Sequence, residues 1–148
     1  MRHFDVFSMN CYDERIPAAQ ITQVSEALQM PVLIGEWHFG ALDVGLPASG
    51  IGHVRSQAER GRAFRLYTET AAAHPACVGV HYFTLYDQSA TGRFDGENYN
   101  IGLLDVCNHP YGPLVEAARA SHERLYEVAS GGEPPFEDAP EYLPKLFL

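Results

Sequence analysis

The sequence predicts an α/β fold built around a parallel β-sheet. Three short, largely apolar segments alternate with three stretches in which apolar residues recur at helical spacing. The loops that carry chemically useful side chains all follow a strand segment and precede a helical one. Such loops lie at the carboxyl ends of parallel strands, which is the active-site edge of either a (β/α)8 barrel or an open doubly wound sheet.

The first β-α unit is expected over residues 4–29. Phe4 to Met9 has the short, largely apolar character of a strand. Pro17 then opens a helix that runs to Gln29, because proline is favoured at the first helical position. Ile21, Val24 and Leu28 share one face of that helix and are expected to face the core.

The second unit begins at Val32, where an apolar run that is too short and too β-branched for a helix ends at Glu36. His38 to His53 is rich in Gly, Pro and Ala and is predicted to be a long surface loop. Loops of this length inside compact domains are usually functional. Ser56 to His74 is the second helix, ended by Pro75. Its predicted buried stripe is Ala63, Phe64, Tyr67 and Ala71.

The third unit opens with a strand from Cys77 to Tyr86, followed by a polar loop over residues 87–100. Ile101 to Val106 is a short apolar segment, and a third helix is expected from Pro113 to Ala129. Its inward residues are predicted to be Leu114, Ala118, Leu125 and Val128. Residues 1–130 should therefore form one folded unit, and residues 131–148, rich in proline and acids, an extended tail.

Composition excludes several classes of function. The 148 residues are 46 % apolar and 20 % charged, which suits one domain with a real core. A formal net charge of −9 argues against nucleic acid and anionic membranes as partners. No segment reaches transmembrane length, and the N-terminus lacks the apolar core of a signal peptide. A signal could still lie upstream of Met1, so the sequence leaves a cytoplasmic and a secreted location open.

Neither a metal nor another cofactor is predicted. Cys11, Cys77 and Cys107 are too far apart for a C-x-x-C metal site, and they are expected to be free and largely buried thiols. The seven histidines show no H-E-x-x-H or comparable ligand spacing. Phosphate-binding glycine motifs are absent as well.

The strongest chemical signal is Glu36, a carboxylate that directly follows an apolar strand segment. Trp37, His38 and Phe39 come next. Aromatic neighbours supply sugar-stacking surface or a low-dielectric wall, and either would tune the acid. The alternative is a strand-end glutamate that merely meets solvent or a helix. Side chains in the other loops suit neutral, hydroxyl-rich ligands.

Two segments resemble the end of a retaining glycoside hydrolase barrel. They are Gly-Glu-Trp-His-Phe-Gly at residues 35–40 and a stretch over residues 81–102 that contains Thr-Gly-Arg-Phe-Asp-Gly-Glu-Asn at 91–98. The similarity is to the agarase and β-galactosidase-like branch of the large clan of (β/α)8 retaining glycosidases. It spans roughly residues 4–129 and implies a partial (β/α)8 barrel made of strands six to eight with their helices.

The resemblance implies roles for two residues. Glu36 would be the nucleophile, and Tyr12 the tyrosine that hydrogen-bonds and orients it. A retaining glycosidase also needs a carboxylic acid about 5–5.5 Å from the nucleophile. In the clan this acid/base ends strand four, so it would lie upstream of Met1. The loops offer three other carboxyl groups as alternatives: Asp13, Asp87 and Glu97. The expected partners are an oligo- or polysaccharide substrate and a missing N-terminal barrel segment.

Nine residues are candidates for substrate binding: Trp37, His38, Tyr82, Tyr86, Asp87, Gln88, Arg93, Asp95 and Asn98. His38 should share the strand face of Glu36, where it would bind a sugar hydroxyl or make a structural hydrogen bond. Alternation allows only one parity of the strand-three aromatics to face the centre, and Tyr82 is preferred there in place of the clan's tryptophan. An alternative for Arg93 is an ion pair with Asp95 or Glu97 that fixes the loop.

Three hypotheses of function remain open from the sequence. The first is a fragment of a retaining glycosidase acting on β-linked, galactoside-type saccharides, inactive by itself. The second is a non-catalytic carbohydrate-binding or remnant barrel module. The third is a complete, small doubly wound domain of unrelated function. Extra edge strands or a switch-point crevice would favour the third.

Overall fold

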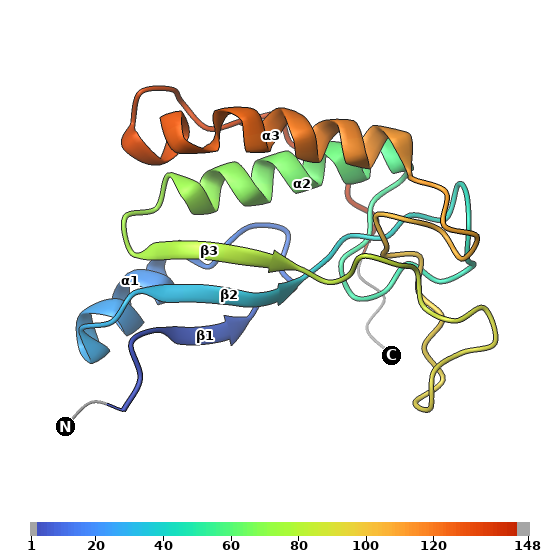
Figure 1. Cartoon of the computed structure of the whole chain (residues 1–148), viewed down its shortest axis with the longest axis horizontal. Helices are drawn as coiled ribbons and strands as arrows, with labels where there is room; N and C mark the ends of the chain where they lie inside the picture. The colour runs from blue at the N-terminus through green and yellow to red at the C-terminus, as the bar shows by residue number, and fades with distance from the viewer. Residues whose placement is uncertain (1–2, 145–148) are drawn as a thin grey trace.

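A computed structural model describes residues 3–144, which form three parallel strands and three helices (Figure 1). The elements follow in the order β1 (Phe7–Asn10), α1 (Ala18–Leu28), β2 (Val32–Trp37), α2 (Gln57–Ala72), β3 (Cys77–Tyr82) and α3 (Gly112–Ser130). β2 lies in the middle and pairs in parallel with β1 and with β3. The predicted alternation of strands and helices and the parallel sheet are confirmed.

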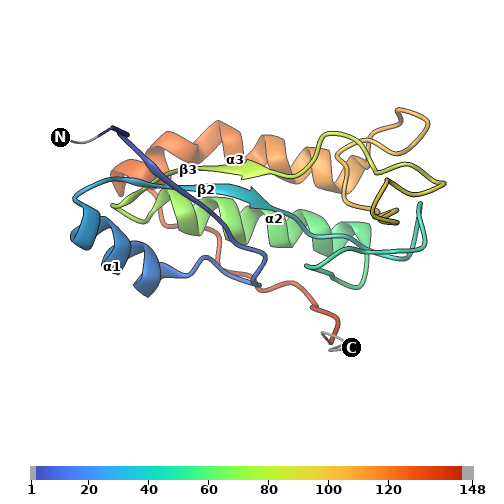
Figure 2. The same ribbon diagram turned by 90° about the horizontal axis from the view of Figure 1, so that it is seen from below.

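All three strands point toward the same end of the molecule, where the long loops gather (Figures 1 and 2). The loop after β2 runs to α2, and the loop after β3 runs to α3. Because the strands are parallel, their carboxyl ends and the side chains that follow them come together at this end. The same end was predicted to hold the functional residues.

The hydrophobic core lies on the helix-covered face of the sheet. Val32, Ile34 and Trp37 of β2 are at most 1 % exposed. They belong to one cluster that also includes Ile21 of α1 and Tyr67 of α2. The predicted stripe of α2 is buried as expected, and so are three of the four residues predicted for α3. The fourth, Leu125, is half-buried, and Leu28 at the end of α1 is 42 % exposed.

A register shift near the end of β2 decides which side chains reach the core. Val32 and Ile34 face the helices, so strict alternation would send Glu36 there too. The pairing of β2 with β3 is irregular between Ile34 and Trp37, and Trp37 takes the core position instead. Its ring stacks on Tyr67 with centroids 4.3 Å apart. Glu36 is therefore released toward the loop end of the sheet.

Two strand ends differ from the prediction. β1 begins at Phe7 rather than Phe4, because β2 begins at Val32 and offers no partner to the earlier residues. β3 ends at Tyr82 rather than Tyr86, because β2 ends at Trp37. Residues 85–87 pair with the apolar segment around Leu104 instead, through amide-to-carbonyl bonds of 2.8 and 2.9 Å.

The predicted tail is extended but anchored to the domain over residues 131–144. The Phe136 amide donates to the buried Glu69 carboxylate at 2.9 Å, and the Tyr142 hydroxyl donates to the Glu14 carbonyl at 2.8 Å. Residues 145–148 of the predicted tail lie outside the described residues. All three cysteines are free, but only Cys11 is buried, so the expectation of largely buried thiols holds for one of them. Within residues 3–144, no helix has the length and apolar character needed to cross a membrane.

Candidate functional site

A cavity of about 280 Å³ lies at the carboxyl ends of the strands. Glu36 reaches it from β2, Tyr12 from the loop after β1, and Phe83 from the residue after β3. The complete lining is Tyr12, Glu36, His38, Ile51, Phe83, Arg93, Glu97 and Tyr99. The cavity therefore combines two carboxylates, one guanidinium and several aromatic rings.

Tyr12 holds Glu36 by a short hydrogen bond. The phenol oxygen donates to Oε2 of Glu36 at 2.6 Å. Burial raises the pKa of Tyr12 well above its ordinary range, and the hydrogen bond to Glu36 and its negative charge raise that pKa further. Tyr12 therefore stays protonated and remains a donor at any pH at which the protein would work. Glu36 accepts this bond through one oxygen, and no other hydrogen bond to its carboxylate is made within residues 3–144.

His38 packs against Tyr12 as a neutral imidazole. It is 3 % exposed, and its ring meets the edge of Tyr12 with centroids 4.8 Å apart. Burial, followed by the charge of Arg60, lowers the pKa of His38 to about 3. The Ile51 amide donates to Nε2 at 3.0 Å, so the ring proton is on Nδ1. His38 and Glu36 both line the cavity, although β2 ends before His38. Of the two roles considered for His38, a structural hydrogen bond is present, from the Ile51 amide.

The loop over residues 88–99 is closed by its own polar side chains. Arg93 forms an ion pair with Glu97 at 2.9 Å and another with Asp95. Gln88 donates to the Glu97 carboxylate at 2.8 Å and accepts the Tyr99 amide at 2.7 Å. The alternative in which Arg93 fixes the loop is the one that the structure has. Arg93 and Glu97 nevertheless also border the cavity.

Two predicted sugar-binding aromatics lie on the wrong face of the sheet. Trp37 is 1 % exposed and packs against Tyr67 and Tyr82 on the helix side. The Tyr82 hydroxyl donates to the Phe39 carbonyl at 3.1 Å and accepts from Arg60 at 3.0 Å. Because successive residues of a strand alternate, Phe83 takes the cavity side. Tyr82, the residue preferred as the stacking platform, does not border this cavity.

Five other candidates do not border the cavity: Tyr86, Asp87, Gln88, Asp95 and Asn98. Asp87 is 8 % exposed, and its carboxylate accepts the Gly102 amide at 2.7 Å and the Tyr111 hydroxyl at 2.6 Å. It braces the loop after β3 and is unavailable to a ligand. Gln88 braces the same loop through Glu97 and Tyr99, and Asp95 forms an ion pair with Arg93 there. Tyr86 is 49 % exposed and pairs with Leu104.

Arg60 of α2 supports the site and was missed from the sequence. It is fully buried and donates to the Phe39 carbonyl, the Gly102 carbonyl and the Gln57 side chain, each at 2.7 Å. It thereby ties the loops after β2 and β3 to one helix. A signal existed, because Arg60 falls on the helical stripe of Phe64 and Tyr67, where an arginine is unusual. Ile51 and Tyr99 come from distant loops and carry no such signal.

The two carboxylates of the cavity have different surroundings. Glu97 is held by a cation and by an amide donor, whereas Glu36 accepts only from a neutral phenol. A carboxylate oriented by one oxygen presents its other oxygen to a reacting carbon. Glu36 therefore has the setting of a nucleophile or of an electrostatic stabiliser. Glu97 has the setting of a structural acid.

No protein-family model matches the chain. It is 39 % identical over 125 residues to β-agarase B of Vibrio sp. (strain JT0107) and 41 % identical over 128 residues to β-agarase A of that strain. These matches cover 84 % and 82 % of this chain. The chain spans only 13 % of the length of each of these relatives.

Solved structures show the same relation. An agarase, AgWH50C, superposes with a TM-score of 0.80 at 42 % identity. The match covers 86 % of this chain and 20 % of the AgWH50C chain. An exo-β-agarase gives a TM-score of 0.80 at 40 % identity over 86 % of this chain and 17 % of its own. A β-galacturonidase from Eisenbergiella tayi shares the fold alone. It is 18 % identical, has a TM-score of 0.54, and the match covers 78 % of this chain and 24 % of the galacturonidase chain. The chain is thus similar to a piece of a polysaccharide-degrading glycoside hydrolase.

Proposed function

We propose that this chain is the C-terminal part of a retaining glycoside hydrolase that cleaves β-linked, galactoside-type polysaccharides. One observation carries the proposal. Glu36 lies at the carboxyl end of the central strand, one residue before its last, with the Tyr12 hydroxyl 2.6 Å away, in a chain about 40 % identical to β-agarases. The substrate class rests on the names of those relatives.

The topology supports a partial (β/α)8 barrel. The spatial order of the strands equals their chain order, and all three helices contribute to a single core cluster. In a doubly wound sheet the strand order reverses at a switch point, and helices cover both faces. A barrel needs a sheet whose strands follow one another in chain order. Eight β-α units, in ~250 residues, close a (β/α)8 barrel, so five units would come from outside this chain.

Glu36 would act as the nucleophile. Its free oxygen attacks the anomeric carbon while the glycosidic bond breaks, and a covalent glycosyl-enzyme forms. Water then attacks the same carbon, the glycosyl–Glu36 bond breaks, and the configuration is retained. The Tyr12 hydroxyl holds the carboxylate in the attacking orientation, and neutral His38 supports the Tyr12 ring from below.

The general acid would come from outside this chain. Departure of the leaving group needs a protonated carboxylic acid opposite the nucleophile. Glu97, the other carboxylate of the cavity, is bound to Arg93 and Gln88. Asp87 is engaged by Gly102 and Tyr111, and Asp13 does not border the cavity. The chain would therefore supply half of the catalytic pair.

Three further side chains would contact the sugar in this proposal. Phe83 offers the apolar face that pyranose rings stack on, and Arg93 offers hydrogen-bond donors at the rim. The third is His38, which would contribute shape rather than charge, since its Nε2 is occupied by the Ile51 amide. Each is open to test by substitution.

The decisive experiment is a chimera of AgWH50C in which this chain replaces the segment that it matches. Its hydrolysis of agarose should fall by orders of magnitude after Glu36→Gln, because the covalent route is lost, while Glu123→Gln on the exposed face of α3 should leave it unchanged. Azide should partly rescue Glu36→Ala and give a product of inverted configuration. Near-parental turnover by the Glu36→Gln chimera would rule out the role.

A second candidate is a non-catalytic carbohydrate-binding or remnant module. It is favoured by the engagement of Glu97, which leaves the cavity with one unengaged carboxylate. This candidate predicts that the chimera binds agarose oligosaccharides without cleaving them. Cleavage that depends on Glu36 would exclude it.

A further inference from the structure

The tail over residues 131–144 returns along α2 to the end of the molecule that holds the cavity (Figure 2). Its Phe136 ring lies over the Arg65 guanidinium, 4.3 Å from the ring centroid, near the middle of α2. Farther along, the Glu141 amide donates to the Glu59 carboxylate, in the first turn of α2, at 2.7 Å. The tail therefore arrives beside the loops that follow the strands.

The backbone of the tail is joined to the loop after β2. Residues 141–143 pair in antiparallel fashion with residues 53–55, through two amide-to-carbonyl bonds of 3.0 and 3.1 Å. Tyr142 stands opposite Val54 in this pairing. The same loop begins with His38, which lines the cavity, so the tail fixes the far end of a cavity-forming loop.

The side chain of Tyr142 bridges the two loops that hold the Tyr12–Glu36 pair. Its hydroxyl donates to the Glu14 carbonyl at 2.8 Å, two residues after Tyr12. Its ring packs on Phe39, three residues after Glu36, with centroids 5.9 Å apart. Burial, followed by the charge of Glu14, raises the pKa of Tyr142 to about 12, so its hydroxyl remains a donor at neutral pH.

Tyr12 thus lies between two backbone carbonyls that are each held by a tyrosine. The Cys11 carbonyl accepts the Tyr67 hydroxyl at 2.9 Å, and the Glu14 carbonyl accepts the Tyr142 hydroxyl. The first anchor comes from α2 and the second from the tail. A functional pair needs such support, because a site loosened by about 1 Å loses much of its effect.

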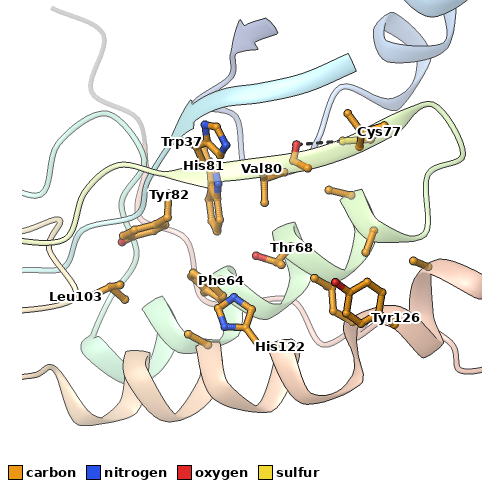
Figure 3. A pocket seen from close by; sticks show the side chains of 17 residues that line it. Trp37, Phe64, Thr68, Cys77, Val80, His81, Tyr82, Leu103, His122 and Tyr126 are labelled. Carbon is orange, nitrogen blue, oxygen red and sulfur yellow. Dashed lines mark hydrogen bonds between the residues drawn. The ribbon is translucent and has the colours of Figure 1, made fainter. Parts of the chain in front are cut away.

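The tail does not serve to cover the apolar surface between β3 and α3. A mostly apolar cavity of about 660 Å³ opens there, and its lining includes no residue of 131–144 (Figure 3). The upper part of the tail instead makes directed hydrogen bonds at the end of the molecule that holds the cavity. Such bonds fix geometry, whereas apolar coverage is non-directional.

We propose that Tyr142 is a positioning residue for the Tyr12–Glu36 pair. It does not border the cavity, and it acts by fixing the backbone at Glu14 and at Phe39. The catalytic part of this inference rests on the proposed function. The geometric part can be measured without turnover.

NMR of the 148-residue chain with ¹³Cζ-labelled tyrosine measures the geometric part. The Tyr12 line is assigned by its loss in Tyr12→Phe, and Glu36→Gln gives its position when the charged acceptor is gone. Tyr142→Phe keeps the ring on Phe39 but deletes the bond to Glu14. It should move the Tyr12 line toward the Glu36→Gln position, because the Tyr12–Glu36 bond is then less populated.

A control variant loosens the tail at its other end. Glu133 pairs with Arg124 of α3 at 2.8 Å, away from the cavity. Glu133→Gln should leave the Tyr12 line in place. Urea unfolding of both variants, measured in parallel, shows whether a shift of that line goes beyond a general loss of stability.

Turnover of the AgWH50C chimera gives the second readout. Tyr142→Phe should lower kcat on agarose by about 10-fold and change KM by less than about 2-fold, since one hydrogen bond that orients the pair is lost and no sugar contact is removed. Tyr142→Ala, which also removes the ring from Phe39, should lower kcat further. Glu133→Gln should change neither constant.

The two readouts fail separately. If the Glu36→Gln chimera keeps its turnover, the catalytic proposal fails, while a shifted Tyr12 line in Tyr142→Phe still supports positioning of the pair. A Tyr142→Phe chain whose Tyr12 line matches that of the parent would overturn the inference. So would a shift or a loss of kcat that Glu133→Gln reproduces, since the tail would then only stabilise the fold.

Discussion

Glu36 and Trp37 are adjacent in sequence but meet opposite environments. The carboxylate borders a cavity at the loop end, and the indole stacks within the core. The pairing of β2 is irregular after Ile34 with both of its neighbours, β1 and β3, and this irregularity separates the two outcomes. Without it, the carboxylate would point at the helices and the indole at the cavity. The register of the backbone therefore decides, as much as residue type does, which of the two side chains faces the cavity.

Tyr12→Phe tests the orienting hydrogen bond. Removal of the hydroxyl leaves the ring packing against His38 but deletes the 2.6 Å bond to Glu36. Turnover of the chimera on agarose should fall by roughly 10²-fold, a typical loss for one well-placed donor, with little change in thermal stability. Glu123→Gln, at an exposed position of α3, is the control. Unaltered turnover of the Tyr12→Phe chimera would mean that the bond is structural only.

His38 gives the stability of the chain a defined pH dependence. Its pKa is about 3 in the folded protein and about 6.5 when unfolded. Between these values only the unfolded chain takes up the proton, so stability is full above pH 6.5 and is lost as the pH falls toward 3. The slope from this residue is about 1.4 kcal/mol per pH unit.

Urea unfolding between about pH 4 and 7 measures that slope. His38→Gln should flatten it, because glutamine can still accept the Ile51 amide but does not titrate. His3→Gln, at an exposed residue before β1, should leave the slope unchanged. Equal slopes for the parent and for His38→Gln would show that the imidazole is already protonated in the fold.

At the scale of elements, periodicity was sufficient to predict the helices but not the strand ends. Helix α2 follows from its own apolar stripe, whose members Phe64 and Tyr67 are buried as expected. The ends of β1 and β3 depend on where β2 starts and stops, and that information lies elsewhere in the chain. The cavity shows the same division. Tyr12, Glu36 and His38 follow strands directly, whereas Ile51 and Tyr99 are brought in by loop folding.

The helices and the tail are joined by one buried acid. Glu69 of α2 is fully buried and accepts from Arg65, Ser121, Arg124 and the Phe136 amide. Its removal would leave cations and donors without their acceptor, which typically costs about 3–5 kcal/mol. Glu69→Ala should therefore lower the melting temperature of the chain by about 10 °C.

Differential scanning calorimetry would measure this loss. Glu123→Ala, at an exposed position of α3, should shift the melting temperature by less than about 2 °C. Glu69→Gln keeps the shape and some of the hydrogen bonds, and it should fall between the two. A Glu69→Ala chain as stable as the Glu123→Ala chain would show that the network contributes nothing net.

At the scale of the whole molecule, the cavity at the strand ends and the free edge of β3 are considered together. In the proposed mechanism Glu36 has no acid/base partner among residues 3–144, where Glu97 is bound to Arg93 and Gln88. Among the same residues, β3 pairs with a strand on one side only, namely β2. In the proposed barrel, further β-α units would bring additional strand ends to the cavity.

The isolated chain is accordingly expected to be inactive on aryl β-galactosides and on agarose oligosaccharides. In the proposed mechanism, attack by Glu36 needs an acid that protonates the leaving oxygen. Within residues 3–144, the other carboxylate of the cavity is Glu97, which is bound to Arg93 and Gln88. The chimera should hydrolyse agarose under the same conditions, which controls for misfolding of this segment. A soluble monomer of the isolated chain with robust, Glu36-dependent hydrolysis would place a second acid within these residues. Glu97→Gln would then be the first variant to make, because only Glu97 shares the cavity with Glu36 among the carboxylates of residues 3–144.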